Sequence, residues 1–401
     1  MSTTADSSDT DTEGDTDTGG STAGTTAGSD TDDTTAGPGG SDSTGSDSDT
    51  DTTTAPTTDP GTSEPTTDSD TTDATDPTDT TDPTTDPTTD TDTDTGEPGD
   101  VGSCFTDKFS ELVPLADYDQ YMPIVGSHCV GTNHQDIEDV ERVVFLGDSV
   151  TVGTPPTPAQ QFYRAQLADA LAMKFGIAAP DIIWKQANPF DGKSASKSSG
   201  AFSSCSEWGA RTDDFVAQIA DCFDGPQLER TLIVITMGGN DLASIAKDAT
   251  DPNNPLPMDQ VLQKTADAAQ LLDDAVVWLT DPMNFPNGSF VIYANVYEYT
   301  DRTGDLGICQ AAQFQNLQGM WPEGMPVINS FNEALMETAV STGTDMIFMS
   351  EEFCGHGFYH DEPTTVCYEE GASNWFDFTC IHPTPEGHGN LAGLFMAVVD
   401  E

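Results

Sequence analysis

The first hundred residues of this 401-residue chain contain no valine, leucine, isoleucine, cysteine or aromatic residue. They hold 35 threonines and 24 aspartates, without a single lysine or arginine. A segment with so little apolar surface cannot offset the conformational entropy that ordering would cost. We therefore expect residues 1–100 to form a disordered, low-complexity stalk, and any folded domain to lie in the 301 residues that follow.

The composition of the stalk leaves two further roles open. Its threonines could carry O-linked glycans, as in mucin-like segments. Its alternating aspartates could bind calcium, which requires a glycine at the sixth position and a glutamate at the twelfth. In the series that begins at Asp90, Gly96 comes one residue too late, and the series that begins at Asp9 reaches Gly20 at the twelfth position. We favour a plain spacer, with an end-to-end distance of roughly 50–60 Å.

The charge of the remaining sequence excludes some classes of partner. Beyond residue 100 there are 43 acidic and 12 basic residues. Nucleic acids and anionic membrane surfaces would be repelled, and no basic patch is available to neutralise phosphates. No apolar run approaches the roughly 20 residues that cross a bilayer. We expect a monomer that binds no nucleic acid and has no transmembrane segment.

All eight cysteines lie beyond residue 100, and none forms a Cys-x-x-Cys motif. An even number of scattered cysteines suggests an oxidising compartment and up to four disulfides, the alternative being reduced buried thiols in a cytosolic protein. We expect a secreted or surface-tethered protein, although this chain begins with no basic or apolar signal segment. Proximity in sequence suggests the pairs Cys104–Cys129, Cys205–Cys222 and Cys354–Cys367, which leaves Cys309–Cys380.

Beyond residue 140, short β-branched runs alternate with stretches of helical spacing. We predict strands at 142–146, 181–184, 231–237, 289–296 and 345–349. We predict helices at 158–175, 212–223, 258–279, 330–341 and 387–399. This alternation is typical of a mainly parallel sheet covered on both faces, which makes a three-layer α/β/α sandwich. Residues 101–140 are predicted to form an irregular extension closed by its own disulfide, and 141–401 the main domain.

Chemically capable residues follow the predicted strands, where ligands bind in such folds. Ser149, in Gly-Asp-Ser directly after the first strand, is placed either as a nucleophile or as a simple helix cap. Gly209 opens a helix and could offer its backbone N–H to an anion. Asn240 follows two glycines at the end of the strongest strand and could donate its amide to an oxyanion. His382 lies just before the N-cap of the last helix and could serve as a base.

Four motifs in this order resemble those of the SGNH (GDSL-type) hydrolases: Gly-Asp-Ser at 147–149, a glycine block at 209, Gly-x-Asn-Asp at 238–241 and His-Pro at 382–383. The resemblance spans residues 142–388 and implies a flavodoxin-like α/β/α fold with no metal and no organic cofactor. It implies that Ser149 is the nucleophile and His382 the general base. The oxyanion would then be held by the backbone N–H groups of Ser149 and Gly209 and by the amide of Asn240.

One position departs from the family pattern. The family carries an aspartate three residues before the histidine to hold the imidazole, and here that position is Thr379. Asp377, five residues before His382, could replace it if the loop bulges. Alternatively, a backbone carbonyl orients the ring and a Ser–His dyad operates. The predicted catalytic set is therefore Ser149, His382 and Asp377, with the acid open.

A second cluster could in principle hold zinc, because Cys354, His356 and His360 are closely spaced. The flanking glycines and Pro363 favour a disulfide-clipped loop instead.

These observations predict a serine esterase that hydrolyses short-chain acyl or acetyl esters of carbohydrates or lipids through an acyl-serine intermediate. The alternative is a catalytically impaired module of the same fold that binds glycans at a cell surface. The threonine at position 379 supports that alternative, and the retention of Ser149, Gly209, Asn240 and His382 argues against it.

Overall fold

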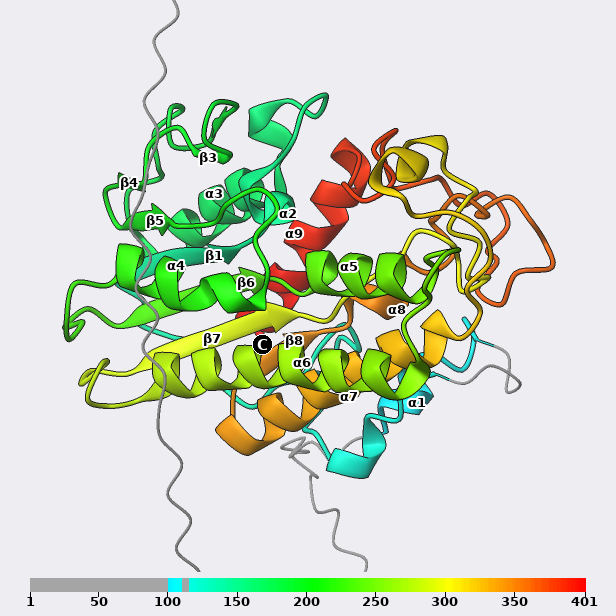
Figure 1. Cartoon of the computed structure of the whole chain (residues 1–401). Coiled ribbons are helices and arrows are strands. Elements are labelled where there is room, and N and C mark those ends of the chain that lie inside the picture. The colour runs from blue at the N-terminus through cyan, green and yellow to red at the C-terminus, as the bar shows by residue number, and fades with distance from the viewer. Residues whose placement is uncertain (1–99, 110–114) are drawn as a thin grey trace, which may run out of the picture. The chain divides into compact units, whose positions relative to one another are not determined.

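The computed structural model describes residues 100–109 and 115–401 (Figure 1). The stalk predicted for residues 1–100, with its calcium and glycan alternatives, therefore lies outside the described residues except for Asp100. None of the described helices is both long enough and apolar enough to cross a membrane.

A six-stranded sheet forms the centre of the described domain. Its strands, in spatial order, are β4 (Ser198–Ser199), β5 (Phe202–Ser204), β1 (Arg142–Gly147), β6 (Thr231–Thr236), β7 (Ser289–Ala294) and β8 (Asp345–Ile347). Only β4 is antiparallel to its neighbour, and the other pairs are parallel. All six residues of β6 are buried, which explains its continuous apolar run, because a central parallel strand is covered on both faces. A separate hairpin pairs β2 (Ala187–Asn188) with β3 (Lys193–Ser194).

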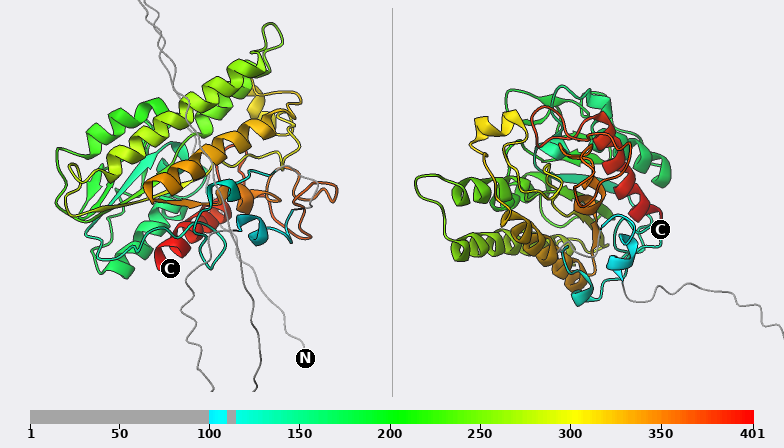
Figure 2. Two further views of the ribbon diagram at one scale, coloured as in Figure 1. Left: turned by 90° about the horizontal axis from the view of Figure 1, so that it is seen from below. Right: turned by 90° about the vertical axis from the view of Figure 1, so that its right-hand side faces the viewer.

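Helices cover both faces of the sheet (Figure 2). On one face lie α3 (Tyr163–Phe175) and α9 (Pro385–Asp400), and on the other lie α4 (Phe215–Cys222), α6 (Met258–Thr280) and α7 (Gly324–Thr342). α6 buries a stripe of residues at spacings of three and four, from Val261 to Leu279, as its sequence predicts. The predicted three-layer α/β/α sandwich with a mainly parallel sheet is confirmed.

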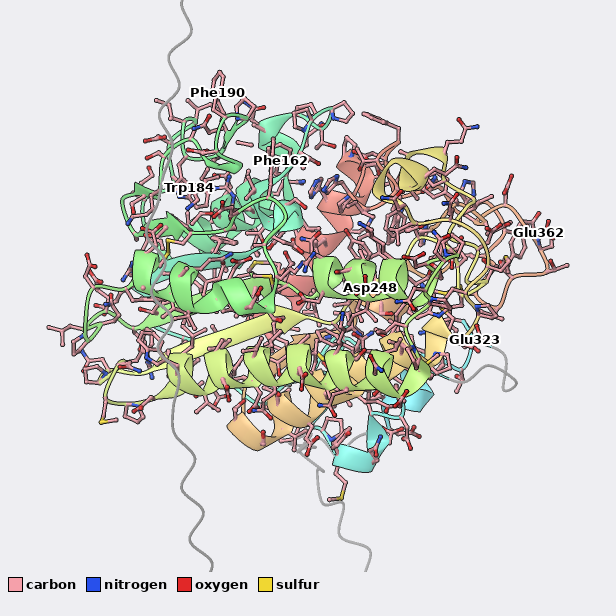
Figure 3. The ribbon with its side chains drawn as sticks, in the orientation of Figure 1. Phe162, Trp184, Phe190, Asp248, Glu323 and Glu362 are labelled. Atoms are coloured by element: carbon pink, nitrogen blue, oxygen red, sulfur yellow. A yellow bond between two sulfur atoms is a disulfide. The ribbon has the colours of Figure 1, made fainter. Side chains whose placement is uncertain are left out.

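The strand predicted at 181–184 is wrong, because this segment forms a turn. Oδ1 of Asp181 accepts hydrogen bonds from the backbone N–H groups of Ile183 and Trp184, both at 2.9 Å. Such an Asx turn competes with a sheet ladder for the same donors. Trp184 is nevertheless fully buried, and the guanidinium of Arg164 lies 4.3 Å from the centroid of its ring. By contrast, Phe190 lies at the outer edge of the molecule (Figure 3). The neighbour of β1 on this side is the unpredicted β5.

Several predicted boundaries shift. The last strand ends at Ile347, and Met349, predicted as part of it, begins α8 (Met349–Phe353). The helix predicted at 158–175 begins as a short 3₁₀ turn, η2 (Ala159–Gln161), before α3. The helix predicted at 330–341 begins at Gly324. Besides α8, two α-helices of the domain at 141–401 were not predicted: α2 (Ser149–Val152) and α5 (Gly239–Ala249). α5 follows a two-glycine sequence, which has a low intrinsic helix propensity.

The N-terminal segment packs on the domain through aromatic residues and a disulfide. It contains α1 (Val101–Cys104) and the 3₁₀ turn η1 (Asp119–Tyr121). The ring of Tyr118 stacks on Phe348 at 5.8 Å, and its hydroxyl donates to Oε1 of the buried Glu351 at 3.0 Å. The structure forms the three disulfides that sequence proximity suggested, Cys104–Cys129, Cys205–Cys222 and Cys354–Cys367, and the remaining pair, Cys309–Cys380.

Candidate active site

The predicted nucleophile begins a short helix at the carboxyl end of β1. Ser149 is the first residue of α2, and the N-cap residue, Asp148, accepts a hydrogen bond from the backbone N–H of Val150 at 2.9 Å. The strand-to-helix turn depends on Gly147, whose φ of 137° is accessible mainly to glycine. A Cβ at this position would also collide with the carbonyl oxygen of Thr236 on β6. The turn therefore fixes where the serine hydroxyl is presented.

His382 and Ser149, 233 residues apart in sequence, are in hydrogen-bond contact. Nε2 of the imidazole lies 2.8 Å from the serine Oγ. Burial lowers the pKa of His382, and the negative charge of Asp377 opposes this shift in part. The imidazole is therefore neutral near pH 7, which is the state that can accept the serine proton.

The loop that carries His382 is held in place by its own backbone. The N–H of Asp377 donates to the carbonyl of His382 at 2.8 Å, and the N–H of Thr384 donates to the carbonyl of Trp375 at 2.7 Å. The hydroxyl of Tyr297, beyond β7, donates to the carbonyl of Ile381 at 2.7 Å. Thr384 then caps α9, as its sequence predicts, by accepting from the N–H of Gly387. Hydrogen bonds therefore hold the backbone both before and after His382, and this fixes the position of its imidazole.

Asp377 reaches the imidazole through Thr379. Oγ1 of Thr379 lies 2.7 Å from Nδ1 of His382 and 2.5 Å from Oδ1 of Asp377. In the described part of the chain, Nδ1 of His382 has no other hydrogen-bond partner, so neither a direct carboxylate contact nor a backbone carbonyl orients the ring. The sequence singled out both positions but did not anticipate that their side chains are hydrogen-bonded in series to the ring.

Two of the three predicted oxyanion donors, Gly209 and Asn240, lie on adjoining segments. Asn240, near the start of α5, donates its Nδ2–H to the carbonyl of Ala210 at 2.9 Å. Asp241 accepts from the N–H and the hydroxyl of Thr212 at 3.1 and 3.0 Å, which ties the start of α5 to the turn that contains Gly209. Across the described residues, the N–H groups of Ser149 and Gly209 donate to no protein group. Both amides are therefore free to bind an anion.

An apolar pocket of about 120 Å³ adjoins Ser149 and Asn240. Its walls include Leu242 and Ala246 of α5 and Tyr297 and Tyr299 beyond β7. The sequence did not reveal the contribution of the segment 306–325, which supplies Leu306, Leu317, Trp321 and Met325. This segment has no clear periodicity, and only the tertiary fold brings it to the pocket. Trp375 and Phe376 do not line this pocket; both are buried, and the ring of Phe376 packs against that of Tyr297.

The alternative zinc cluster is not assembled. The sulfur of Cys354 is bonded to Cys367 and is not available as a thiolate ligand. His356 stacks on Trp375, and its Nδ1 lies 2.8 Å from the carbonyl oxygen of Ser373. This segment is therefore a loop closed by a disulfide, as the sequence predicted.

Comparison with known proteins identifies the family to which the sequence is similar. The model of the GDSL-like Lipase/Acylhydrolase family matches residues 145–389. Among solved structures, an extracellular lipase from Streptomyces rimosus is 20% identical and covers 65% of this chain and 100% of its own, with a TM-score of 0.38. Phospholipase A1 from Streptomyces albidoflavus is 17% identical and covers 65% and 98%, with a TM-score of 0.37. An acetylxylan esterase from Geobacillus stearothermophilus is 15% identical and covers 67% and 97%, also with a TM-score of 0.37.

The search of curated proteins gives no match. The family match covers more than half of the chain and extends from β1 through the first residues of α9, so it contains every residue of the site described above. The chain belongs to the GDSL-like lipase/acylhydrolase family and is a carboxylic ester hydrolase.

Proposed function

We propose that this protein is a serine esterase in which Ser149 is the nucleophile and His382 the general base. The observation that carries the proposal is the 2.8 Å contact between Oγ of Ser149 and Nε2 of a neutral imidazole, beside an apolar pocket. A serine hydroxyl is a weak nucleophile unless a base takes its proton, and this contact supplies the base.

In this mechanism, Oγ of Ser149 attacks the ester carbonyl carbon while its proton passes to Nε2 of His382. The carbonyl oxygen becomes an oxyanion, which accepts hydrogen bonds from the N–H groups of Ser149 and Gly209 and from Nδ2 of Asn240. Collapse of the tetrahedral intermediate breaks the bond to the alcohol oxygen, and that oxygen takes the proton from His382. Water then repeats the sequence on the acyl-serine and releases the acid.

Replacing Asn240 by alanine should lower kcat about 100- to 1000-fold and change KM little, because the lost hydrogen bond stabilises charge that exists only in the transition state. Steady-state kinetics with a p-nitrophenyl ester measure both constants. Asn390→Ala is a matched control, because Nδ2 of this exposed residue also donates to a backbone carbonyl, that of Glu386. An Asn240→Ala enzyme with the kcat of the control would exclude Asn240 from the oxyanion site.

For the substrate, we propose esters with a short apolar acyl chain. An engineered protein cavity of about 150 Å³ binds benzene, so a pocket of about 120 Å³ has room for a few carbon atoms. Its apolar walls favour an alkyl chain over a sugar ring, which would leave its hydroxyls without partners in such a pocket. The carbohydrate or lipid part of a natural substrate would then be the alcohol, outside this pocket.

A series of p-nitrophenyl esters tests this assignment. We expect kcat/KM to rise about fourfold with each methylene from acetate until the pocket is filled, since each buried methylene contributes about 0.8 kcal/mol. Ala246→Phe should fill the pocket and shift the preference back to acetate. Ala217→Phe, at an exposed position of α4, is the control. Equal kcat/KM values across the series in the wild type would contradict an acyl role for the pocket.

We further propose that the protein works outside the cytosol, with residues 1–100 as a spacer. Four disulfides support this location, because such bonds persist in oxidising compartments. The alternative, a glycan-binding module without activity, has no need for a serine hydroxyl paired with a neutral imidazole. Glycan binding by a folded, oxidised protein that hydrolyses none of the esters would favour it.

A further inference from the structure

The partner of Nδ1 of His382 is a hydroxyl group. Thr379 stands three residues before the histidine, and its Oγ1 bridges Nδ1 of His382 at 2.7 Å and Oδ1 of Asp377 at 2.5 Å. The backbone N–H of Thr379 also donates to the same carboxylate oxygen at 2.8 Å. The loop turns sharply at Cys380, which has a φ of 76° and is bonded to Cys309. This turn places the threonine hydroxyl against the ring.

The bridging hydroxyl has one proton, and its direction follows from its neighbours. An ionised carboxylate can only accept, so the hydroxyl of Thr379 donates to Asp377. Its oxygen must then accept from the ring, which requires a proton on Nδ1 of His382. The lone pair of the neutral imidazole consequently lies on Nε2, facing the hydroxyl of Ser149. The four groups form one chain of hydrogen bonds with a single direction.

The carboxylate of Asp377 has no positively charged partner among the described residues. Its carboxylate is buried, its Oδ2 has no hydrogen-bond partner, and no lysine or arginine of residues 100–109 and 115–401 pairs with it. A buried charge without a counterion is costly. Protonation of His382 during catalysis creates the missing counterion on the far side of the threonine hydroxyl.

We propose that Thr379 is a positioning residue that couples Asp377 to His382, so that the machinery is the series Ser149–His382–Thr379–Asp377. The hydroxyl fixes the imidazole tautomer, and the carboxylate stabilises the imidazolium through it. No proton moves beyond His382: the serine proton stops at Nε2, and Thr379 and Asp377 keep their protonation states. This inference rests on the proposed function and explains how an enzyme with threonine at this position retains an acid.

The test compares Thr379→Val, Thr379→Ser and Asp377→Asn in the full chain, with p-nitrophenyl butyrate as the probe. Valine matches the shape of threonine but has no hydroxyl, so kcat should fall about 100- to 1000-fold with KM within about twofold of the wild type. Serine restores the hydroxyl and should keep kcat within about fivefold of the wild type. Asp377→Asn should lose about as much as Thr379→Val, and the double variant little more, because residues that act as a unit are not additive.

The pH profile separates coupling from simple packing. Thr379 and Asp377 both stabilise the imidazolium, so removing either should lower the pKa of His382 and move the acid limb of kcat/KM to lower pH. Two other buried titratable groups near the site share no hydrogen bond with Thr379 or Asp377. Burial raises the pKa of Asp148 to about 7 and lowers that of His388 to about 3. Both are present in every variant, so the shift between variants reports on His382.

The chain offers a matched control in an exposed loop. The hydroxyl and N–H of Thr364 donate to a carboxylate oxygen of Glu362, two residues earlier, at 2.8 and 3.3 Å, which repeats the arrangement of Thr379 and Asp377. Glu362 lies at the outer edge of the molecule (Figure 3). Thr364→Val and Glu362→Gln should leave kcat and the acid limb unchanged.

A Thr379→Val enzyme with wild-type kcat and an unshifted acid limb would overturn this inference and leave the proposed function intact. A large loss in Asp377→Asn beside a folded Thr379→Val that keeps wild-type kcat would show that the carboxylate acts without the hydroxyl and would also overturn it. A folded wild type without esterase activity would overturn the proposed function and this inference together. Thermal unfolding of each variant identifies any loss of fold, and if Thr379→Val is unfolded, the kinetics of Thr379→Ser and Asp377→Asn decide the question.

Discussion

Replacing Ser149 by alanine should lower kcat for ester hydrolysis by about 10⁶-fold, the scale of loss when a serine hydrolase loses its nucleophile. The substitution removes one oxygen atom from a side chain that is 8% exposed at the start of α2, so the fold should persist. What activity remains would come from the oxyanion donors and the pocket acting on water. Steady-state hydrolysis of p-nitrophenyl butyrate measures the loss.

Ser341→Ala is the control for Ser149→Ala, because this serine is exposed near the end of α7 and away from the carboxyl edge of the sheet. Its kcat should equal that of the wild type. A Ser149→Ala enzyme that retains more than about 1% of wild-type kcat would show that another group attacks the ester, since a lost nucleophile leaves far less.

Replacing His382 by glutamine should cost a comparable factor, about 10⁴- to 10⁶-fold in kcat, because no other base touches Oγ of Ser149 among the described residues. The neutral amide of glutamine cannot take the serine proton in the attack or return one to the leaving alcohol. KM should change little, since His382 does not line the acyl pocket. The same ester assay gives both constants.

His134→Gln is the matched control for the loss of His382. The imidazole of His134 is also largely buried, with Nδ1 2.6 Å from the carbonyl oxygen of Thr344 and Nε2 accepting from the N–H of Ile124 at 3.0 Å. It stands beside the amino end of β8, whereas the site lies at the carboxyl ends of the strands. His134→Gln should therefore reduce thermal stability and leave kcat of the folded enzyme intact. Equal losses of kcat in both variants would mean that His382 is only structural.

The central strands of the sheet could be predicted because a strand that is buried on both faces has a continuous apolar sequence. β1, β6 and β7 read as short apolar runs, and each is covered by helices on both sides. The site followed from them, since the carboxyl ends of parallel strands meet at one edge. This is why the sequence alone places Ser149 and Asn240, each shortly after a strand, at one edge of the sheet, where both line the pocket.

The edge of the sheet could not be predicted, because there local hydrogen bonds compete with strand pairing. Residues 181–184 are β-prone by composition, yet Asp181 holds their N–H groups in a turn. β5 contains two serines, Ser203 and Ser204, in three residues and gives no β signal, but it pairs with β1. Its position is set by its neighbours and by the disulfide at Cys205.

The coupling of Asp377 to His382 lay beyond sequence reasoning for a different reason. The sequence shows a carboxylate five residues and a hydroxyl three residues before the histidine, but not which of them touches the ring. That depends on the path of the loop, which is set by the bridge between Phe376 and Pro383 and by the left-handed backbone at Cys380. A loop of this kind is specified by tertiary contacts and not by periodicity.

The most direct test of the account is covalent labelling of the full-length, oxidised protein with a fluorophosphonate, followed by peptide mass mapping. An activated serine displaces fluoride and becomes phosphonylated, whereas ordinary serines do not react. We expect one adduct per chain, on the peptide that contains Ser149, and none in Ser149→Ala. No adduct on the folded wild type, or an adduct on another residue, would contradict the assignment of Ser149 as the nucleophile.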